Sequence, residues 1–339
     1  MNLKLFCLLA KQAGLAGLMV GMVLLTGCME ETPEAMPPPD ADAAQGPEAE
    51  TAQTPEATSL LGQPLYRQAP SPDDEANLAE AQANFDQDAD EVENIIWLGR
   101  RLAYLWRYQD AIAVYTEGIR KYPDEPKLYR HRGHRYISIR AFDKAVADLE
   151  RAAALIEGTE DEVEPDGQPN DAGIPTSTLH TNVFYHLGLA YYLQGHFDKA
   201  LDAYQKCLAA AGNNDMRVAT LDWLYMTLRR LDRPDEADAA IASVHADMQL
   251  LENFAYHRRL LMYKGEIPPD SLLRVDDADD AALTLATQGY GVGNYYLVSG
   301  ERERAMEIFR QVVGGAYWPA FGYLAAEADL NRAATHDGR

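Results

Sequence analysis

A Gly–Ala pair with a fixed separation of 12 positions recurs along this 339-residue chain and restricts its fold more than any other feature. The pairs are Gly99 with Ala111, Gly133 with Ala145, Gly188 with Ala200, and Gly293 with Ala305. The first two pairs are displaced by 34 residues. Small residues let two helix axes approach closely, so each pair predicts two helices that cross at the Gly and the Ala. One such unit cannot bury its apolar face alone, and we therefore expect consecutive units to stack.

Aromatic and aliphatic residues recur in step with these pairs. The second copy reads Tyr129-x2-Arg132-Gly133-x2-Tyr136 and then Ala145-x3-Leu149, and the third reads Phe184-x2-Leu187-Gly188-x2-Tyr191 and then Ala200-x3-Tyr204. A weaker fourth copy has Tyr225 in place of the glycine, 12 residues before Ala237. The pattern resembles the tetratricopeptide repeat, a helix–turn–helix unit of 34 residues, over roughly residues 90–332.

The resemblance implies an all-α fold: a superhelical solenoid of stacked antiparallel helix pairs with a capping C-terminal helix. We expect this solenoid to span residues 72–335, to begin with a helix over about 72–86 and to end with one over 318–330. The expected repeats lie near residues 92–125, 126–156, 181–212, 218–247 and 286–316. An irregular helix pair is expected in the insert 246–282.

A second insert, residues 157–178, is rich in Asp, Glu, Gly and Pro. Its length suggests a purpose, since most connections between helices are shorter. It is interpreted as an ordered structural loop, a partner contact or a Ca²⁺ site, although its carboxylates lack the spacing of an EF-hand loop.

The N-terminus has the features of an export signal. Lys4 and Lys11 precede an apolar stretch from Leu15 to Leu25, which is too short to span a membrane. The stretch ends in Leu25-Thr26-Gly27-Cys28, which resembles a bacterial lipoprotein box. The resemblance implies a signal peptide over residues 1–27, and Cys28 as the first mature residue, carrying acyl chains such as palmitate that anchor it in a membrane. The alternative is an ordinary secretory signal with an incidental cysteine.

The lipoprotein resemblance also implies a location. Met29 rather than Asp follows Cys28, which by similarity to enteric lipoproteins favours the outer membrane, with the protein facing the periplasm. The inner membrane and the cell surface remain open alternatives.

Residues 28–71 are expected to form a disordered tether rich in Pro, Ala and Glu. Between Met29 and Thr58 there is no Lys or Arg, and such a composition cannot bury a core. A spacer between membrane and domain is the simplest interpretation, and a recruitment motif within it is the alternative. The locally apolar segment from Leu60 to Tyr66 is expected to pack on the edge of the folded domain.

Charge and motifs exclude several classes of function. The chain has 30 Lys+Arg against 53 Asp+Glu, a formal charge of -23 that argues against binding nucleic acid. It has no P-loop, Gly-rich dinucleotide turn, GxSxG or HExxH motif, so we expect no enzyme activity and no cofactor. His131 and His134 lie three residues apart but have no evident third ligand, so no metal site is predicted. Cys207 is interpreted as a buried, inert thiol.

The inner face of such a solenoid is lined mainly by the first helix of each repeat. Mapping the family's groove positions onto this sequence selects mainly basic, polar and aromatic residues. They are Arg100, Tyr104, Lys127, Arg130, His134, Asn182, Tyr185, His186 and Arg229. Arg and Asn suit carboxylates, which predicts a protein or peptide partner with an acidic segment or a C-terminal carboxylate. The alternative is that these residues are simply solvated.

Together these features predict a membrane-anchored, non-enzymatic adaptor or scaffold of the bacterial cell envelope that binds a partner peptide in its groove. One alternative is a structural subunit of an envelope assembly that contacts partners through its convex face. A weaker one is a hydrolase with a site at Asp161, Asp166 and Asp171 in the insert. The identity of the partner and the oligomeric state are left open by the sequence.

Overall fold

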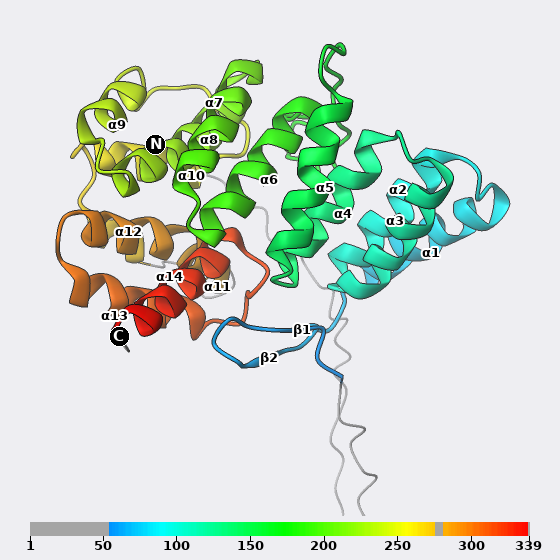
Figure 1. Cartoon of the computed structure of the whole chain (residues 1–339), viewed down its shortest axis with the longest axis horizontal. Helices are drawn as coiled ribbons and strands as arrows, with labels where there is room; N and C mark the ends of the chain where they lie inside the picture. Colours follow the sequence, from blue (N-terminus) through cyan, green and yellow to red (C-terminus); the bar gives the residue numbers. More distant parts are fainter. Residues whose placement is uncertain (1–53, 275–280, 338–339) are drawn as a thin grey trace, which may run out of the picture. The chain divides into compact units, whose positions relative to one another are not determined.

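Helices joined in pairs by tight turns make up most of the chain between residues 54 and 337 (Figure 1). The computed structural model describes residues 54–274 and 281–337. The α-helices are α1 Pro72–Gln87, α2 Val92–Tyr104, α3 Tyr108–Lys121, α4 Pro126–Ser138, α5 Phe142–Leu155, α6 Leu179–Gln194, α7 Phe197–Ala210, α8 Asn214–Arg230, α9 Pro234–Ile241, α10 Phe254–Tyr263, α11 Ala281–Thr284, α12 Tyr290–Val298, α13 Arg302–Val313 and α14 Phe321–Asp337. A 3₁₀ turn η1 (Pro269–Leu273), a π-helical turn η2 (Leu285–Gly289) and two short strands, β1 (Ala57–Thr58) and β2 (Pro64–Leu65), complete the elements.

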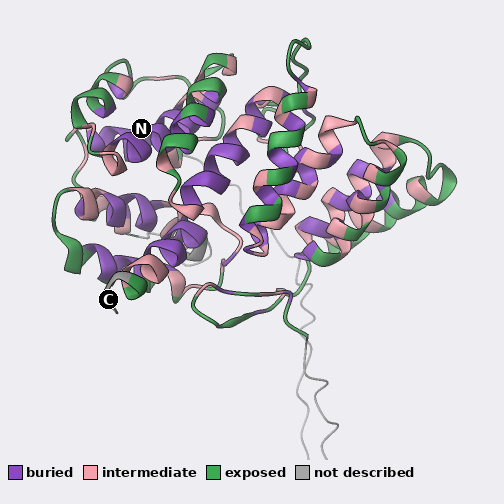
Figure 2. Cartoon of the chain, in the orientation of Figure 1, coloured by how far each residue is buried: buried purple, intermediate pink, exposed green. Residues whose placement is uncertain are grey.

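The predicted repeats are present as helix pairs. The pairs α2–α3, α4–α5, α6–α7, α8–α9 and α12–α13 occupy the predicted repeat positions, and successive pairs pack side by side (Figure 1). Buried residues concentrate where neighbouring helices face one another (Figure 2). The all-α solenoid is therefore confirmed. No helix in residues 54–274 and 281–337 has both the length and the apolar content to cross a membrane.

The glycines lie where the two helices of a pair cross, as the sequence predicts. A Cβ atom placed on each glycine would collide with the residue 16 positions later in the second helix of the pair. The approach would be 2.8 Å to Leu149 for Gly133, 2.7 Å to Tyr204 for Gly188 and 2.5 Å to Phe309 for Gly293, and Gly99 meets Tyr115 in the same way. The paired alanines Ala111, Ala145, Ala200 and Ala305 are fully buried. Close packing thus explains the repeat pattern.

The turn within a pair requires a left-handed residue. Gly195 and Gly300 supply it in two repeats, whereas Trp106, Arg140 and Asp232 adopt positive φ values of 56°, 66° and 57° in three others. A side chain in this conformation costs about 1–2 kcal/mol, so a compensating contact is expected. Trp106 and Arg140 make such contacts with the C-terminal part of the chain.

The C-terminal helix closes the structure instead of only capping the last repeat. Arg140, in the turn between α4 and α5, forms a buried ion pair with Glu327 of α14 at 2.6 Å. Its guanidinium also donates to the Trp318 carbonyl at 3.1 Å, and the Trp318 ring lies 5.2 Å from that of Trp106. Helix α14 also packs against α6 and α13. The inner face is consequently covered in part by the chain's own C-terminus.

Part of the predicted tether is folded. Residues 54–71 hold the β1–β2 pair, in which Glu56 binds Arg67 at 2.6 Å, and the Trp318 indole donates to the Tyr66 carbonyl at 2.8 Å. The boundary at residue 71 was therefore wrong, because the apolar segment around Leu65 packs on the domain as expected. The signal peptide, Cys28 and the rest of the tether lie outside the described residues.

The other boundaries differ slightly from expectation. Helix α1 matches the predicted stretch and begins at an N-cap, Ser71, whose side chain accepts from the Asp74 amide. In the insert 246–282, the described residues 246–274 hold α10 and the 3₁₀ turn η1. Helix α14 begins at Phe321, three residues after the predicted start, because Trp318 is held in the preceding turn.

Candidate functional site

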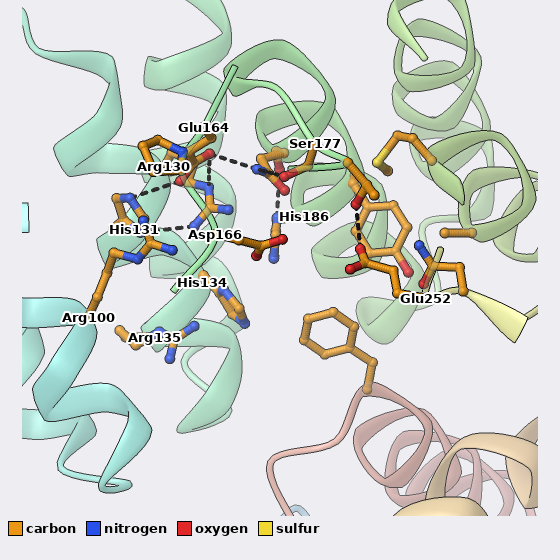
Figure 3. A pocket seen from close by; sticks show the side chains of 18 of the residues that line it. Arg100, Arg130, His131, His134, Arg135, Glu164, Asp166, Ser177, His186 and Glu252 are labelled. Atoms are coloured by element: carbon orange, nitrogen blue, oxygen red, sulfur yellow. Dashed lines mark hydrogen bonds and ion pairs between the residues drawn. The ribbon is translucent and has the colours of Figure 1, made fainter. Parts of the chain in front are cut away.

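A polar cavity of about 310 Å³ lies on the inner face of the first four repeats (Figure 3). Its walls come from α2, α4, α6 and α8, from the insert 157–178, from the segment leading into α10, and from the start of α14. The lining residues are Arg100, Tyr104, Tyr115, Arg130, His131, His134, Arg135, Glu164, Pro165, Asp166, Thr176, Ser177, Asn182, Tyr185, His186, Met216, Ala219, Glu252, Asn253, Tyr256 and Phe321. The volume falls at the lower end of the range of about 300–1,000 Å³ that is typical of small-molecule pockets.

The cavity brings together most of the groove residues predicted from the sequence. Seven of the nine line it: Arg100, Tyr104, Arg130, His134, Asn182, Tyr185 and His186. Lys127 and Arg229 do not. Lys127 instead pairs with Glu93 at 3.1 Å and Glu162 at 3.3 Å, and Arg229 donates to the Tyr225 hydroxyl at 2.8 Å.

One carboxylate of the insert is buried in this site. Glu164 accepts from the Asn182 side-chain amide at 2.7 Å and lies 3.0 Å from His131 Nε2 and 3.3 Å from Arg130 Nε. Burial alone would raise the pKa of Glu164, but the charge of Arg130 and the His131 hydrogen bond outweigh it and hold the pKa below its ordinary value. The inner face therefore already holds a carboxylate of its own chain.

The histidines of the site are neutral. Burial, and then the nearby Arg130, lower the pKa of His131 to about 3. Arg130 donates to His131 Nδ1 at 2.9 Å, which leaves the proton on Nε2, 3.0 Å from Glu164 Oε1. Burial also lowers the pKa of His186 to about 3 and that of His134 well below its usual value. His134 Nδ1 is buried without a hydrogen-bond partner among the described residues.

Two arginines of the cavity have no carboxylate within ion-pair distance in the described part of the chain. Arg100 contacts the Tyr104 hydroxyl at 3.4 Å and stacks over the Trp97 ring at 4.3 Å. Arg135 lies 5.5 Å from the centre of the Tyr108 ring. An unpaired guanidinium in a cavity is a ready partner for a ligand carboxylate or phosphate.

The backbone of the insert fits closely over this basic wall. A Cβ on Gly167 would collide with the Tyr104 hydroxyl, and the Gly167 carbonyl accepts from Arg101 Nη1 at 3.1 Å. The insert is further fixed at its ends, where the Asp161 carboxylate accepts from the His180 amide at 3.0 Å. This arrangement favours the ordered-loop interpretation of the insert. The described residues contain no group of three or more His, Cys, Asp and Glu placed to hold a metal ion.

Several residues of the site were not selected from the sequence. Glu164 and Asp166 come from the insert, Glu252 from the segment before α10 and Phe321 from α14, and only the fold brings them to the cavity. Arg135 could have been predicted from the sequence, since it follows His134 in the same basic helix. The dense run of acids in the insert, next to a basic inner face, was the signal for Glu164.

Nothing in the cavity has the arrangement of a nucleophilic centre. The remaining candidate, Cys207 of α7, lies outside it. Its thiol is buried beside Thr220 Oγ1 at 3.2 Å, and burial raises the pKa of Cys207 to about 12. A thiol of that pKa is protonated at neutral pH, in agreement with the inert role expected for it.

The repeat at the centre of the chain matches a known family. Residues 181–214, which contain α6 and α7, match the tetratricopeptide repeat family. The other helix pairs and their Gly–Ala crossings share the architecture of this repeat.

The chain is similar to several proteins at low identity. BBSome complex member BBS4 of Bos taurus is 26% identical over 137 residues, 40% of this chain and 22% of that protein. Small glutamine-rich tetratricopeptide repeat-containing protein 2 of Saccharomyces cerevisiae is 28% identical over 116 residues, 34% of this chain and 28% of that protein. The chain thus spans about a quarter of the length of these curated relatives.

Solved structures show a similar level of likeness. A tetratricopeptide repeat protein from Parabacteroides merdae is 16% identical, with 76% of this chain and 92% of that one covered at a TM-score of 0.42. YrrB, described as a tetratricopeptide repeat protein with an unusual peptide-binding site, is 15% identical, with 76% and 97% covered at a TM-score of 0.39.

Proposed function

We propose that this protein is a non-enzymatic interaction scaffold whose inner face binds an acidic group of a partner protein. Tetratricopeptide repeats mediate contacts between proteins, and the described residues supply a polar cavity without a nucleophilic centre. The observation that carries the proposal is the pair Arg100 and Arg135, which line the cavity without a carboxylate partner among the described residues. The neighbouring contact of Arg130 with Glu164 shows how this face holds a carboxylate.

Affinity capture with the full-length, detergent-solubilised protein tests the scaffold role. Arg100→Glu and Arg135→Glu should each remove a protein that the unmodified chain captures from envelope extract, because the reversed charge repels its acidic group. Arg120→Glu is the matched control, since Arg120 of α3 is exposed and lies outside the cavity. If both cavity variants capture the same proteins as the control, the inner face is not the binding surface. Arg130 is unsuitable for this test, because reversing a buried, paired charge would disrupt folding.

We also propose that the scaffold is anchored in the cell envelope through a lipid on Cys28, on the outer membrane facing the periplasm. The support is the Leu25-Thr26-Gly27-Cys28 sequence after a short apolar stretch. Metabolic labelling with an alkyne-bearing fatty acid should mark the protein, and Cys28→Ala should abolish the label and move the protein from the membrane to the soluble fraction. Labelling that persists in Cys28→Ala would refute the anchor, and fractionation of the two membranes tests the location.

One observation favours a second candidate, a structural subunit that contacts partners through its convex face. The insert and α14 cover part of the inner face, which leaves the outer helices of the repeats more accessible. Lys144 of α5 and Lys199 of α7 are exposed there. If Lys144→Glu and Lys199→Glu abolish capture while Arg100→Glu preserves it, the convex face is the interaction surface.

A further inference from the structure

The cavity carries charge of both signs, and Glu252 lies on the side opposite the arginines. Figure 3 shows Arg100, Arg135 and His134 on one side and Glu252 on the opposite side, with Asp166 between them. The lining carries three arginines and three carboxylates, but only Arg130 and Glu164 are within ion-pair distance of each other. The remaining charges face the cavity without a charged partner at that distance.

The acidic wall is held in place by neutral groups. Glu252 accepts from the Thr176 hydroxyl and, at 3.0 Å, from the Asn170 amide. No Lys, Arg or His nitrogen lies within ion-pair distance of Glu252 or Asp166 in the part of the chain that the structure describes. Burial, and then the charge of Glu252, raise the pKa of Asp166 by more than the charges of Arg100 and Arg130 lower it.

The two arginines on the opposite side, Arg100 and Arg135, also lack a charged partner within ion-pair distance among the described residues. The hydrogen bond and ring contacts of Arg100 and Arg135 are with neutral groups, namely aromatic rings and the Tyr104 hydroxyl. His134 adds a buried Nδ1 that has no partner among the described residues. Guanidinium groups on one side, with Glu252 on the other and Asp166 between them, are complementary to a molecule that carries an anion and a cation at its two ends.

Size and lining limit what such a molecule can be. The cavity measures about 310 Å³, and the insert on one side and Phe321 of α14 on the other restrict the passage of a long chain. Tyr185, Tyr256 and Phe321 provide apolar surface between the charged walls. A free amino acid carries its ammonium and carboxylate groups on the same Cα atom, whereas a dipeptide separates them by one further residue and so reaches both sides more readily.

We propose that this cavity binds a dipeptide-sized zwitterion with both ends free, its carboxylate at Arg100 and Arg135 and its ammonium between Asp166 and Glu252. The inference goes beyond the scaffold role, because it assigns the cavity a small ligand of its own. A partner's acidic group would compete with this ligand for Arg100. Occupancy of the cavity would then govern partner binding.

The test uses the full-length protein and three dipeptide libraries: one with both ends free, one N-acetylated and one C-amidated. Thermal unfolding with millimolar free dipeptides should show a higher Tm, and native mass spectrometry should identify the bound members. Either cap should remove the effect, because each deletes one of the two charges. No rise in Tm with the free library, or an equal rise with a capped one, would overturn the proposal.

Variants then assign the two ends. Arg100→Ala and Asp166→Asn should each weaken the dipeptide selected from the library about tenfold or more, the usual effect of losing a charge-assisted contact. Arg120→Ala should leave the affinity unchanged. Asp166→Asn alters a partly exposed loop residue, so it provides the test even if Arg100→Ala folds poorly. Unchanged affinity in Asp166→Asn would overturn the placement of the ammonium.

If free dipeptides fail to bind but Arg100→Glu still abolishes partner capture, this inference falls and the scaffold role stands.

Discussion

At the scale of single residues, glycine positions set how closely helices pack. Gly188 of α6 faces the buried ring of Tyr204, and even one added methyl group would lie 2.7 Å from it. The ring is fully buried and cannot move aside without displacing other core residues. The same relation holds at Gly99, Gly133 and Gly293. The glycines that define the sequence repeat are therefore also the positions where the two helices of a pair are in close contact.

We expect Gly188→Ala to lower the free energy of unfolding by about 1–3 kcal/mol, because the added methyl group overpacks a closed contact. Urea unfolding followed by circular dichroism measures this change. Gly212→Ala is the matched control: Gly212 has no atom within 4 Å of an added Cβ and no positive φ, so its change should stay within about 0.5 kcal/mol. Equal stability of both variants would show that the helices of this pair are not in close contact.

Buried neutral histidines make stability depend on pH. The pKa of His186 is about 3 in the folded protein, against an ordinary value near 6.5 in the unfolded chain. Between these values the unfolded chain binds a proton that the folded protein excludes, so stability falls as the pH drops below about 6.5. The contribution is complete above that pH and is lost progressively toward about pH 3.

We therefore expect His186→Asn to reduce the loss of unfolding free energy between pH 7.5 and pH 5 by about 2 kcal/mol. Urea titrations at the two pH values give the difference directly. His245, which is exposed and paired with Asp247 on the surface, provides the control, and His245→Gln should leave the loss unchanged. A pH dependence identical in wild type and His186→Asn would mean that the imidazole is not buried in the neutral form.

At the scale of elements, the insert 157–178 behaves as a part of the inner face. Its Glu164 accepts from Asn182 and lies within ion-pair distance of Arg130 and His131, and these three residues belong to helices of two neighbouring repeats. Sequence reasoning predicted the groove residues from their repeat positions but offered three interpretations of the insert. The reason is physical. A loop has no repeating pattern that would indicate which of its side chains face the neighbouring helices, so its contacts depend on where the fold places its two ends.

Glu164→Gln should lower the free energy of unfolding by about 3–5 kcal/mol, since it leaves the buried Arg130 without a charged partner. Asp171→Asn, an exposed position in the same insert, should change it by less than about 0.5 kcal/mol. Chemical denaturation measures both variants under the same conditions. Similar stability of the two would show that the insert does not depend on its buried carboxylate.

At the scale of the whole folded unit, buried ion pairs connect segments that are distant in sequence. Arg140 reaches Glu327 at 2.6 Å, Arg259 reaches Asp222 at 2.8 Å, and Arg230 binds Asp329. The first of these joins the second repeat to α14. Glu327 also accepts from the Leu60 amide of the N-terminal segment. The Glu327 carboxylate thus connects α14 with the second repeat and with the N-terminal segment.

Glu327→Gln should release this connection and lower the free energy of unfolding by about 3–5 kcal/mol, because Arg140 stays buried without its charge partner. Limited proteolysis should then cut residues 54–71 faster than in the wild type, since their contact with α14 is weakened. Glu307→Gln, at an exposed site on α13, is the control. Proteolysis at an unchanged rate would show that the closure does not depend on Glu327.

By itself, the sequence determined the helix pairs, their order and the glycine contacts, because these depend on spacing within about 34 residues and on side-chain size. Seven of the nine groove residues that it predicted meet in the cavity. Only the tertiary structure decided that α14 folds back over the inner face, that residues 54–71 are folded, and that the insert places Glu164 against Arg130. Those contacts join residues far apart in the chain, and their strength comes from burial, which no local pattern encodes.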